Sequence, residues 1–298
     1  MFNKNTPGPE PGVHTAIVTP FRGGRIDTDA FVRLLGIQRA SDVAGVVVLG
    51  TTGESPTVRP GERSELIRLA KSVLGGKKQL TVGCGCNDTE KTVRTVKRAA
   101  QLGADFALVV TPYYNRPSQR GLLRHFITVA DASPVPGIVY NVPSRTGVDI
   151  SAETLSVLAG HPNIVACKEA STDMQSVTEK IRTVPLDFFC GSDTLLYHFL
   201  SLGAKGSVCV CSNIATDLTC GIVDGFLSGE TGAAREAFFR ILPFLSALGC
   251  DVNPVPIKAL LGCAGLISPE VRQPLCGLTE EKRSALLIAA AEAGVYVK

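Results

Sequence analysis

Eight short apolar runs follow one another along the chain between residues 14 and 210. They are rich in Val, Ile, Ala, Phe and Cys, and they lack a strict alternation of apolar and polar positions. Continuous apolar runs of this length are typical of strands covered on both faces, as in parallel sheets. The predicted strands span residues 14–19, 45–50, 79–84, 105–111, 137–141, 163–168, 187–192 and 205–210.

Segments with helical spacing of apolar residues separate these runs. Residues 27–42 open with Asp27 and Thr28, both favourable N-cap residues. The segments that begin SAET and DTEK combine a capping residue with charge in the first turn, and several segments end in Gly. The predicted helices span residues 27–42, 60–75, 88–103, 118–133, 151–160, 171–184 and 193–203.

Alternating strands and helices predict a parallel sheet with right-handed crossovers. Eight strands favour a closed (β/α)8 barrel, the TIM-barrel fold, over an open doubly wound sheet, which usually has fewer strands. No G-x-G-x-x-G follows the first run. After about residue 230 the pattern changes to helices without strands, at 235–249, 253–266 and 279–294. We therefore expect a catalytic barrel over 1–230 and a three-helix C-terminal region over 231–298.

Composition and charge exclude several classes of partner. The 298 residues carry 30 basic and 27 acidic side chains, a net charge of +3. This balance argues against a nucleic-acid or anionic-membrane partner. Neither an apolar signal segment nor an apolar run of about 18 residues occurs, so we expect a cytosolic protein without a transmembrane helix.

The ten cysteines are expected to act as small buried hydrophobes, because several fall inside apolar runs. The two C-x-C pairs do not have the spacing of a zinc site, and the four histidines are scattered. We therefore predict no metal.

Lys168 ends the apolar run IVACK and is the first candidate for chemistry. A lysine at the mouth of a barrel should be partly desolvated, which favours the neutral amine. A neutral amine can attack a ketone and form a Schiff base. The alternative is a structural lysine that reaches solvent or pairs with Glu169, and position alone does not separate the two.

Hydroxyl groups gather at the predicted strand ends, where barrel enzymes build their sites. Thr51 and Thr52 lie in GTTGES, and three of the five tyrosines (Tyr113, Tyr114 and Tyr140) follow the fourth and fifth runs. Such hydroxyls can both donate and accept, so they can pass a proton from one hydroxyl to the next. Each taken alone fits a structural role, as a turn cap or a plug of the barrel mouth, but together they favour a proton relay.

Arg145 lies in a predicted loop, SRTG, and GSD at 191–193 follows the seventh run. A guanidinium at the rim can hold a carboxylate with two hydrogen bonds, although a solvated loop arginine is the alternative. The GSD segment also fits a simple helix cap.

The order and spacing of GTTGES, TPYYNRPS, YNVPSRTG and CKEAS resemble the dihydrodipicolinate synthase family, which belongs to the pyruvate-dependent aldolases and lyases together with N-acetylneuraminate lyase. The similarity runs from about residue 13 to the C-terminal helices, where NPVPIK at 253–258 also matches. It implies a lyase that condenses pyruvate with L-aspartate 4-semialdehyde in lysine and diaminopimelate biosynthesis.

The resemblance implies a role for each candidate. Lys168 would condense with pyruvate, and Thr52, Tyr140 and Tyr114 would relay protons, with Tyr114 reaching into a neighbouring subunit. Thr51 would orient the relay and the pyruvate carboxylate.

The substrate side of the implied site is formed by a rim arginine and two backbone positions. Arg145 would bind the carboxylate of the semialdehyde, and the backbone near Gly191 and Val208 would line the pocket. The family needs no organic cofactor or catalytic metal and usually forms a homotetramer of tight dimers.

A regulatory site implied by the family departs from its usual pattern here. Relatives inhibited by lysine carry a carboxylate at the position of Lys91, and often histidines where this chain has Pro60 and Arg63. Ser55, Asn87 and Tyr113 are retained, which describes a degenerate effector site. Cations beside a cationic effector repel it, so we expect lysine to inhibit weakly or not at all.

Two other functions stay open. A sibling aldolase or lyase would use the same Schiff base on another 2-oxo acid or sugar acid, and fold analogy cannot separate the siblings. A non-catalytic relative would bind pyruvate or a partner protein, but the presence of Lys168, Tyr140 and Thr52 argues against it.

Overall fold

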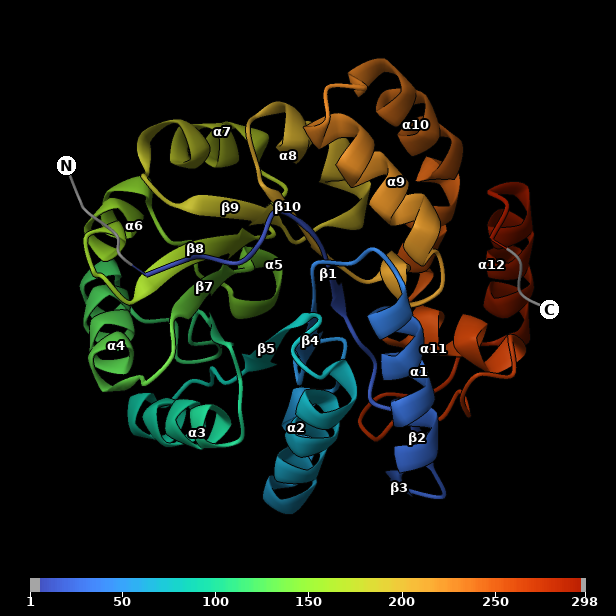
Figure 1. The fold of residues 1–298 in the computed structure, drawn as a ribbon, viewed down its shortest axis with the longest axis horizontal. Helices are drawn as coiled ribbons and strands as arrows, with labels where there is room; N and C mark the ends of the chain where they lie inside the picture. Colours follow the sequence, from blue (N-terminus) through green and yellow to red (C-terminus); the bar gives the residue numbers. More distant parts are fainter. Residues whose placement is uncertain (1–5, 296–298) are drawn as a thin grey trace.

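Eight parallel strands close into a barrel in the computed structural model, which describes residues 6–295. Around the barrel the order is β1, β4, β5, β6, β7, β8, β9 and β10, which pairs with β1 again (Figure 1). Each strand overlaps one predicted run, so the (β/α)8 barrel is confirmed. The strands are β1 Gly12–Ala16, β4 Gly45–Val48, β5 Gln79–Gly83, β6 Phe106–Val110, β7 Gly137–Asn141, β8 Ile164–Glu169, β9 Asp187–Cys190 and β10 Gly206–Cys209.

Helices form the outer layer of the barrel (Figure 1). Several begin as predicted: the Asp27 carboxylate accepts from Ala30 N–H, and the Asp88 carboxylate accepts from Lys91 N–H. The outer helices are α1 Thr28–Ala40, α2 Pro60–Leu74, α3 Thr89–Gln101, α4 Gln119–Ala132, α6 Ala152–Ala159, α7 Met174–Thr183, α8 Leu196–Ser201 and α9 Thr216–Leu227. The short turns are α5 Pro143–Thr146, η1 Ser55–Thr57, η2 Asp193–Leu195, η3 Cys211–Asn213 and η4 Leu248–Cys250.

Two helices and a small hairpin were absent from the prediction. The helix α9 completes the eighth strand–helix unit, and the turn α5 replaces the loop expected around Arg145. A small antiparallel hairpin, β2 Phe21–Arg22 with β3 Arg25–Ile26, follows β1. Strands of two residues are too short to show a periodic pattern, and Gly23 and Gly24 turn the hairpin with φ of 58° and 74°.

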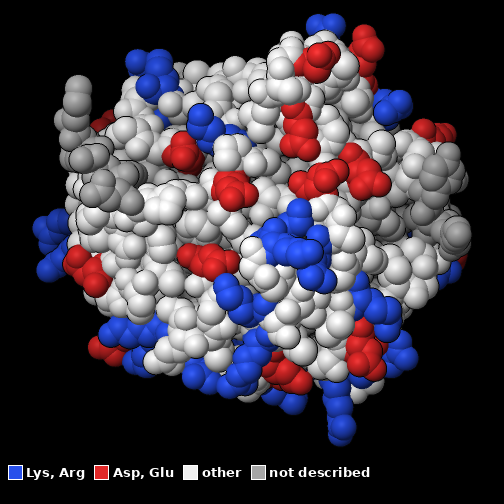
Figure 2. All heavy atoms as spheres, in the orientation of Figure 1, with Lys and Arg blue, Asp and Glu red and all other residues white. Residues whose placement is uncertain are grey.

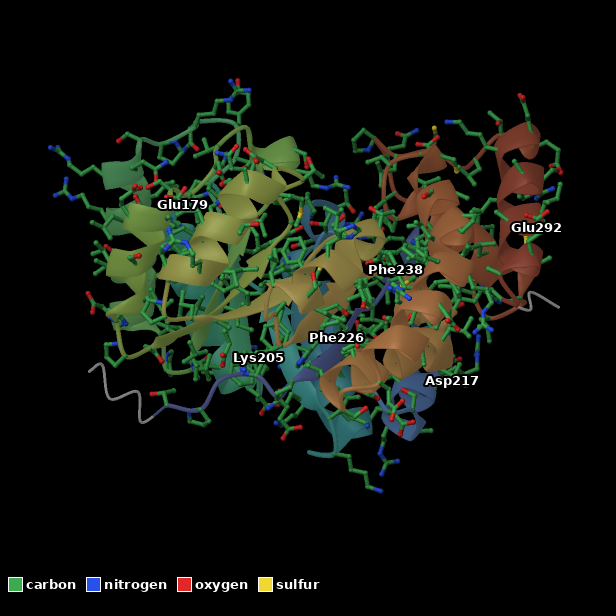
Figure 3. All side chains as sticks on the ribbon, turned by 90° about the horizontal axis from the view of Figure 1, so that it is seen from above. Glu179, Lys205, Asp217, Phe226, Phe238 and Glu292 are labelled. Carbon is green, nitrogen blue, oxygen red and sulfur yellow. The ribbon has the colours of Figure 1, made fainter. Side chains whose placement is uncertain are left out.

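The three predicted C-terminal helices are present as α10 Thr231–Ala247, α11 Val255–Cys263 and α12 Glu280–Glu292, without a strand between them. They lie beside the barrel next to α9 and α1 (Figure 1). The ring of Tyr197 on α8 stacks on Phe238 of α10, with centroids 5.9 Å apart, and meets the edge of Phe226 at 5.3 Å. Phe226 and Phe238 lie where the barrel meets the C-terminal helices (Figure 3).

Side chains inside and outside the barrel form two separate apolar clusters. Ile138 and Tyr140 of β7 belong to the inner cluster, whereas Val139 between them belongs to the outer one. The same alternation on β8 places Ala166 inside and Cys167 outside. Position along a strand therefore decides which side chains enter the barrel.

No single helix of the described part of the chain is long and apolar enough to cross a membrane. The helices Thr231–Cys250 and Val255–Cys263 reach that length and composition together, but a bend of 111° separates them.

Candidate active site

Lys168 points into the barrel from the end of β8. It lies two residues after Ala166, on the inner face, and its Cα pairs across the sheet with that of Tyr140. Only 7 % of Lys168 is exposed, and its Nζ lies 4.2 Å from the centroid of the Tyr140 ring. The amine therefore sits against an aromatic ring in a largely dehydrated position, as the sequence predicted.

The adjacent residue, Glu169, faces the opposite side of β8 and does not pair with Lys168. Its carboxylate binds Lys180 Nζ at 3.2 Å and accepts from Asn141 Nδ2 at 2.9 and 2.8 Å. Burial raises the pKa of Glu169, and the charge of Lys180 opposes that shift. The alternatives in which Lys168 pairs with Glu169 or reaches bulk solvent are therefore wrong.

Gly191 provides the space for the Lys168 side chain. A Cβ at this position would lie 2.9 Å from Lys168 Cε and 2.8 Å from Ala170 Cβ. Gly191 N–H also donates to the Glu169 carbonyl at 2.7 Å. The backbone of β8 and the segment after β9 thus approach each other closely, and only glycine allows that approach beside the lysine.

The turn that carries Thr51 and Thr52 is held by the C-terminal region. Asn253 Nδ2 donates to Thr52 Oγ1 at 3.1 Å, and Thr52 is 3 % exposed. Glu54, in the left-handed region with φ of 50°, binds Lys258 Nζ at 2.6 Å. This anchor links residues more than 200 positions apart, which no local sequence pattern connects.

The Glu54 carboxylate has a second partner in the same region. Its other oxygen accepts from Arg272 N–H at 3.0 Å. Lys258 and Glu54 side chains are 0 % and 2 % exposed, and Lys258 Nζ lies 4.3 Å from the Phe21 ring centroid. Burial lowers the pKa of Lys258, and the charge of Glu54 opposes that shift.

A cavity of about 740 Å³ is lined by residues that follow β4, β5 and β7, the strands that end before Gly50, Cys84 and Val142. Thr51, Tyr140 and Arg145 line it together. Three residues of the degenerate effector site, Ser55, Lys91 and Tyr113, line the same cavity, whereas Asn87 does not. Lys168 itself is not part of this lining, and the predicted residues Thr52, Gly191 and Val208 also lie outside it; Val208 is buried in the inner cluster.

Tyr114 is not brought together with Lys168 and Tyr140 within one chain. It is 90 % exposed, and its backbone has φ of 72°, a conformation that a bulky residue rarely adopts. In the single chain the Tyr114 ring therefore projects into solvent.

Comparison with known proteins identifies the family. A model of the Dihydrodipicolinate synthetase family matches residues 10–293. The chain belongs to the dihydrodipicolinate synthetase family. The 4-hydroxy-tetrahydrodipicolinate synthase of Leptospira biflexa is 41 % identical over 271 residues, which cover 90 % of this chain and 92 % of that protein.

Solved structures of dihydrodipicolinate synthases share this fold closely. The enzyme from Thermotoga maritima has a TM-score of 0.95 and 37 % identity, covering 97 % of this chain and 100 % of that chain. The enzyme from Cyanidioschyzon merolae, solved with lysine bound, has a TM-score of 0.92 and 35 % identity, covering 96 % and 99 %. The family resemblance stated from four motifs is confirmed.

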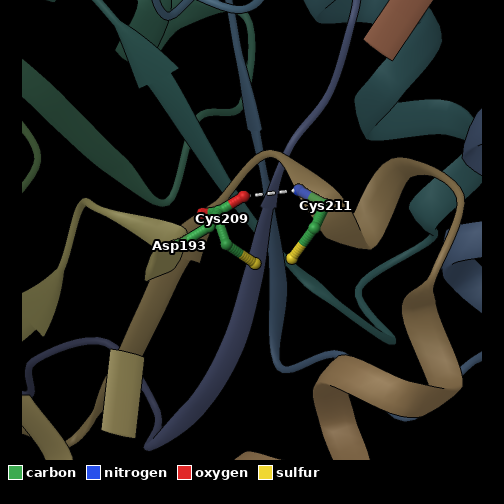
Figure 4. Close-up of side chains that lie close together, drawn as sticks. All are labelled: Asp193, Cys209 and Cys211. Atoms are coloured by element: carbon green, nitrogen blue, oxygen red, sulfur yellow. Dashed lines mark hydrogen bonds between the residues drawn. The ribbon is translucent and has the colours of Figure 1, made fainter. Parts of the chain in front are cut away.

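Asp193 fixes the end of β10 in this dihydrodipicolinate synthetase family member and does not cap a helix. Its carboxylate accepts from Val210 N–H at 3.1 Å and from Cys211 N–H at 2.7 Å (Figure 4). The Cys209 and Cys211 sulfurs and an Asp193 oxygen lie within 4.8 Å of one another. Because that carboxylate already accepts backbone N–H groups, and Cys209 Sγ donates to Ser212 Oγ at 3.1 Å, the cluster is a network of hydrogen bonds.

The expectation for the cysteines holds for six of them. Cys84, Cys167, Cys190, Cys209, Cys211 and Cys220 are buried, three others are half-buried, and Cys276 is exposed. Burial raises the pKa of the Cys84 thiol to about 12, so this thiol stays protonated.

Proposed function

We propose that the protein is a 4-hydroxy-tetrahydrodipicolinate synthase that condenses pyruvate with L-aspartate 4-semialdehyde through a Schiff base on Lys168. The observation that carries this proposal is the Lys168 amine, which lies buried beside the ring of Tyr140 and forms no salt bridge within the described residues 6–295. The amine attacks the ketone carbon of pyruvate and water leaves. Loss of a methyl proton then gives an enamine, whose carbon attacks the aldehyde before the product cyclises away from the lysine.

The proton transfers are assigned to hydroxyl groups. Thr52 and Tyr140 carry protons at the Schiff base, and Thr51 orients them and the pyruvate carboxylate. The partly buried hydrogen bond from Asn253 supports a fixed position for the Thr52 hydroxyl. The backbone near Gly191 and Val208 closes the pocket around the pyruvate adduct.

Tyr114 completes the relay in a neighbouring subunit, and the assembly is a homotetramer built from dimers. The support is the strained backbone and the 90 % exposure of this tyrosine, because a large ring held away from its own chain suits insertion into a second copy. Deletion of the Tyr114 hydroxyl by Tyr114→Phe should lower kcat while pyruvate still forms its adduct.

Trapping the adduct tests the nucleophile. The protein is incubated with pyruvate, reduced with sodium borohydride, and analysed by intact mass and peptide mapping. We expect one reduced pyruvate adduct on Lys168 and none in Lys168→Met. A folded protein that gives no adduct, or an adduct on another lysine, would refute the proposal.

Arg145 is assigned to the carboxylate of the semialdehyde, because it is exposed and lines the cavity at the barrel mouth. Arg145→Ala should raise KM for the semialdehyde at least tenfold, while pyruvate trapping changes little. Equal losses for both substrates would contradict this role. A panel of 2-oxo acids and aldehydes in the same assay separates the synthase from sibling lyases.

Lysine should inhibit the enzyme weakly or not at all. Lys91 and Arg63 line the cavity next to Ser55 and Tyr113, and two cations there oppose binding of an ammonium group. The assay is a titration of lysine against the condensation rate. Strong inhibition at physiological concentration would show that the charge argument is wrong.

A further inference from the structure

The loop that carries Arg145 is closed at its base by the side chain of Asn141. This asparagine follows Tyr140 as the last residue of β7, and it is 0 % exposed. Its Oδ1 accepts from Ile150 N–H at 3.2 Å, and its Nδ2 donates to Asp149 Oδ1 at 2.6 Å. The two ends of the loop are therefore held together at the end of β7.

Asp149 also connects the loop to α7 and to β8. Its Oδ1 binds Lys180 Nζ at 2.6 Å, and its Oδ2 accepts from Ser176 Oγ at 3.2 Å. Lys180 Nζ reaches Glu169 Oε2 at 3.2 Å as well, and Glu169 directly follows Lys168 in β8. One ammonium group thus links the end of the loop to the strand that carries the proposed nucleophile.

The link through Lys180 is both buried and charged. Acidic and basic side chains are spread over the face of the molecule shown in Figure 2, whereas the Lys180 side chain is only 1 % exposed. Burial alone would lower the pKa of Lys180, but the charge of Glu169 and the hydrogen bond to Asp149 raise it above its usual value. A charge-assisted hydrogen bond is short and strong, so this ammonium group fixes the two carboxylates that it joins.

The Arg145 guanidinium depends on its loop for its position. Within the described residues 6–295 it has no hydrogen-bond or ion-pair partner of its own. Its side chain lines the cavity, whereas Asp149 lies outside that lining. A shift of the loop would therefore move the guanidinium, and misplacement of a binding group by about 1 Å can cost a large factor in rate.

We propose that Asp149 is a positioning residue for the second substrate and that it acts through Arg145. Held by Lys180 and Asn141, its carboxylate fixes the loop in the position in which the guanidinium meets the carboxylate of the semialdehyde. This inference rests on the proposed function, because it assumes the role assigned there to Arg145. The attack of the lysine amine on pyruvate does not require Asp149.

Kinetics and trapping in variants of Asp149 test this role. Asp149→Ala should raise KM for the semialdehyde about tenfold, since it frees the end of the loop from α7, while the yield of trapped pyruvate stays within about twofold of the wild type. Asp149→Asn keeps an oxygen that can accept from Asn141 and Lys180, so its KM should lie between those of the wild type and Asp149→Ala. An unchanged KM in Asp149→Ala, or an equal loss in pyruvate trapping, would overturn the proposal.

A double variant tests whether Asp149 acts through Arg145. In Arg145→Ala the guanidinium is gone, so loss of the loop anchor has no binding group left to misplace. Arg145→Ala with Asp149→Ala should therefore have a KM for the semialdehyde within about twofold of that of Arg145→Ala alone. Effects of the two substitutions that multiply would show independent roles and refute the proposal.

Asp105→Ala is the matched control. Asp105 also pairs with a lysine, Lys71 at 2.9 Å, and its side chain is 36 % exposed against 39 % for Asp149. It precedes β6, at the end of the barrel opposite Lys168. With every variant assayed under conditions in which urea unfolding shows it to be folded, Asp105→Ala should keep KM for the semialdehyde within about twofold. An equal rise of KM in Asp105→Ala and Asp149→Ala would overturn the proposal, because a general loss of stability would explain both.

The outcomes separate this inference from the proposed function. If Arg145→Ala itself leaves KM for the semialdehyde unchanged, the assignment of Arg145 fails and this inference fails with it. If Arg145→Ala raises KM and Asp149→Ala does not, only the positioning role of Asp149 is refuted. Trapping of pyruvate on Lys168 is a separate measurement and tests the nucleophile in either case.

Discussion

The ion pair between Lys258 and Glu54 should be one of the most costly contacts to break in this protein. Both side chains are almost completely buried, at 0 % and 2 % exposure, and Nζ lies 2.6 Å from Oε1. The substitution Lys258→Met keeps an unbranched apolar side chain but removes the ammonium that lies over the Phe21 ring. Among the hydrogen bonds of the described residues, it leaves the Glu54 carboxylate with the Arg272 N–H alone.

Removal of one partner of a buried pair typically costs about 3–5 kcal/mol, because an uncompensated charge stays in the interior. Glu54→Gln with Lys258→Met removes both charges, and Gln keeps an acceptor for Arg272 N–H, so the double variant should recover part of this loss. Urea unfolding of the single and double variants measures the change in the free energy of unfolding.

The same substitution should affect the site, because Glu54 ends the turn that carries Thr51 and Thr52. We expect slower formation of the pyruvate adduct in Lys258→Met under conditions where the variant is fully folded. Lys282→Met is the control, since its ion pair with Asp251 lies at the surface. A loss of stability in Lys258→Met no larger than in this control would refute the reasoning.

Two further substitutions test the packing at Lys168 and the response to acid. Gly191→Ala should slow pyruvate trapping strongly, because its Cβ would displace Lys168 Cε, whereas Gly221→Ala, with open space around it, should leave trapping unchanged. Burial lowers the pKa of His14 from 6.5 to about 4. Protonation of His14 is therefore less favourable in the folded state than in the unfolded state. Neutral His14 contributes about 3 kcal/mol to the free energy of unfolding above pH 6.5, and this contribution is lost as the pH falls toward 4. Urea unfolding at pH 7 and pH 4.5 should show a smaller acid loss in His14→Gln than in the wild type, and an unchanged acid loss in His14→Gln would contradict this.

The apolar runs of the sequence determined the barrel and the direction of Lys168. A strand alternates its side chains between two faces, so the run IVACK already places Ala166 and Lys168 on one face. Parallel strands then align their carboxyl ends, which brings Tyr140 and Lys168 to neighbouring positions. These relations depend on local periodicity, and periodicity is visible in the sequence.

Only the tertiary structure decided how the site is supported and charged. Glu169 turned out to pair with Lys180, and Asn253 with Thr52, because strand registers and helix packing bring together residues that no local pattern connects. Arg63 of α2 and Arg98 of α3 likewise line one cavity because the two helices pack beside each other on the outside of the barrel. Local sequence sets the identity of each element, whereas pairing across the closed barrel sets the neighbours of each side chain, and the chemistry of a charged group depends on those neighbours.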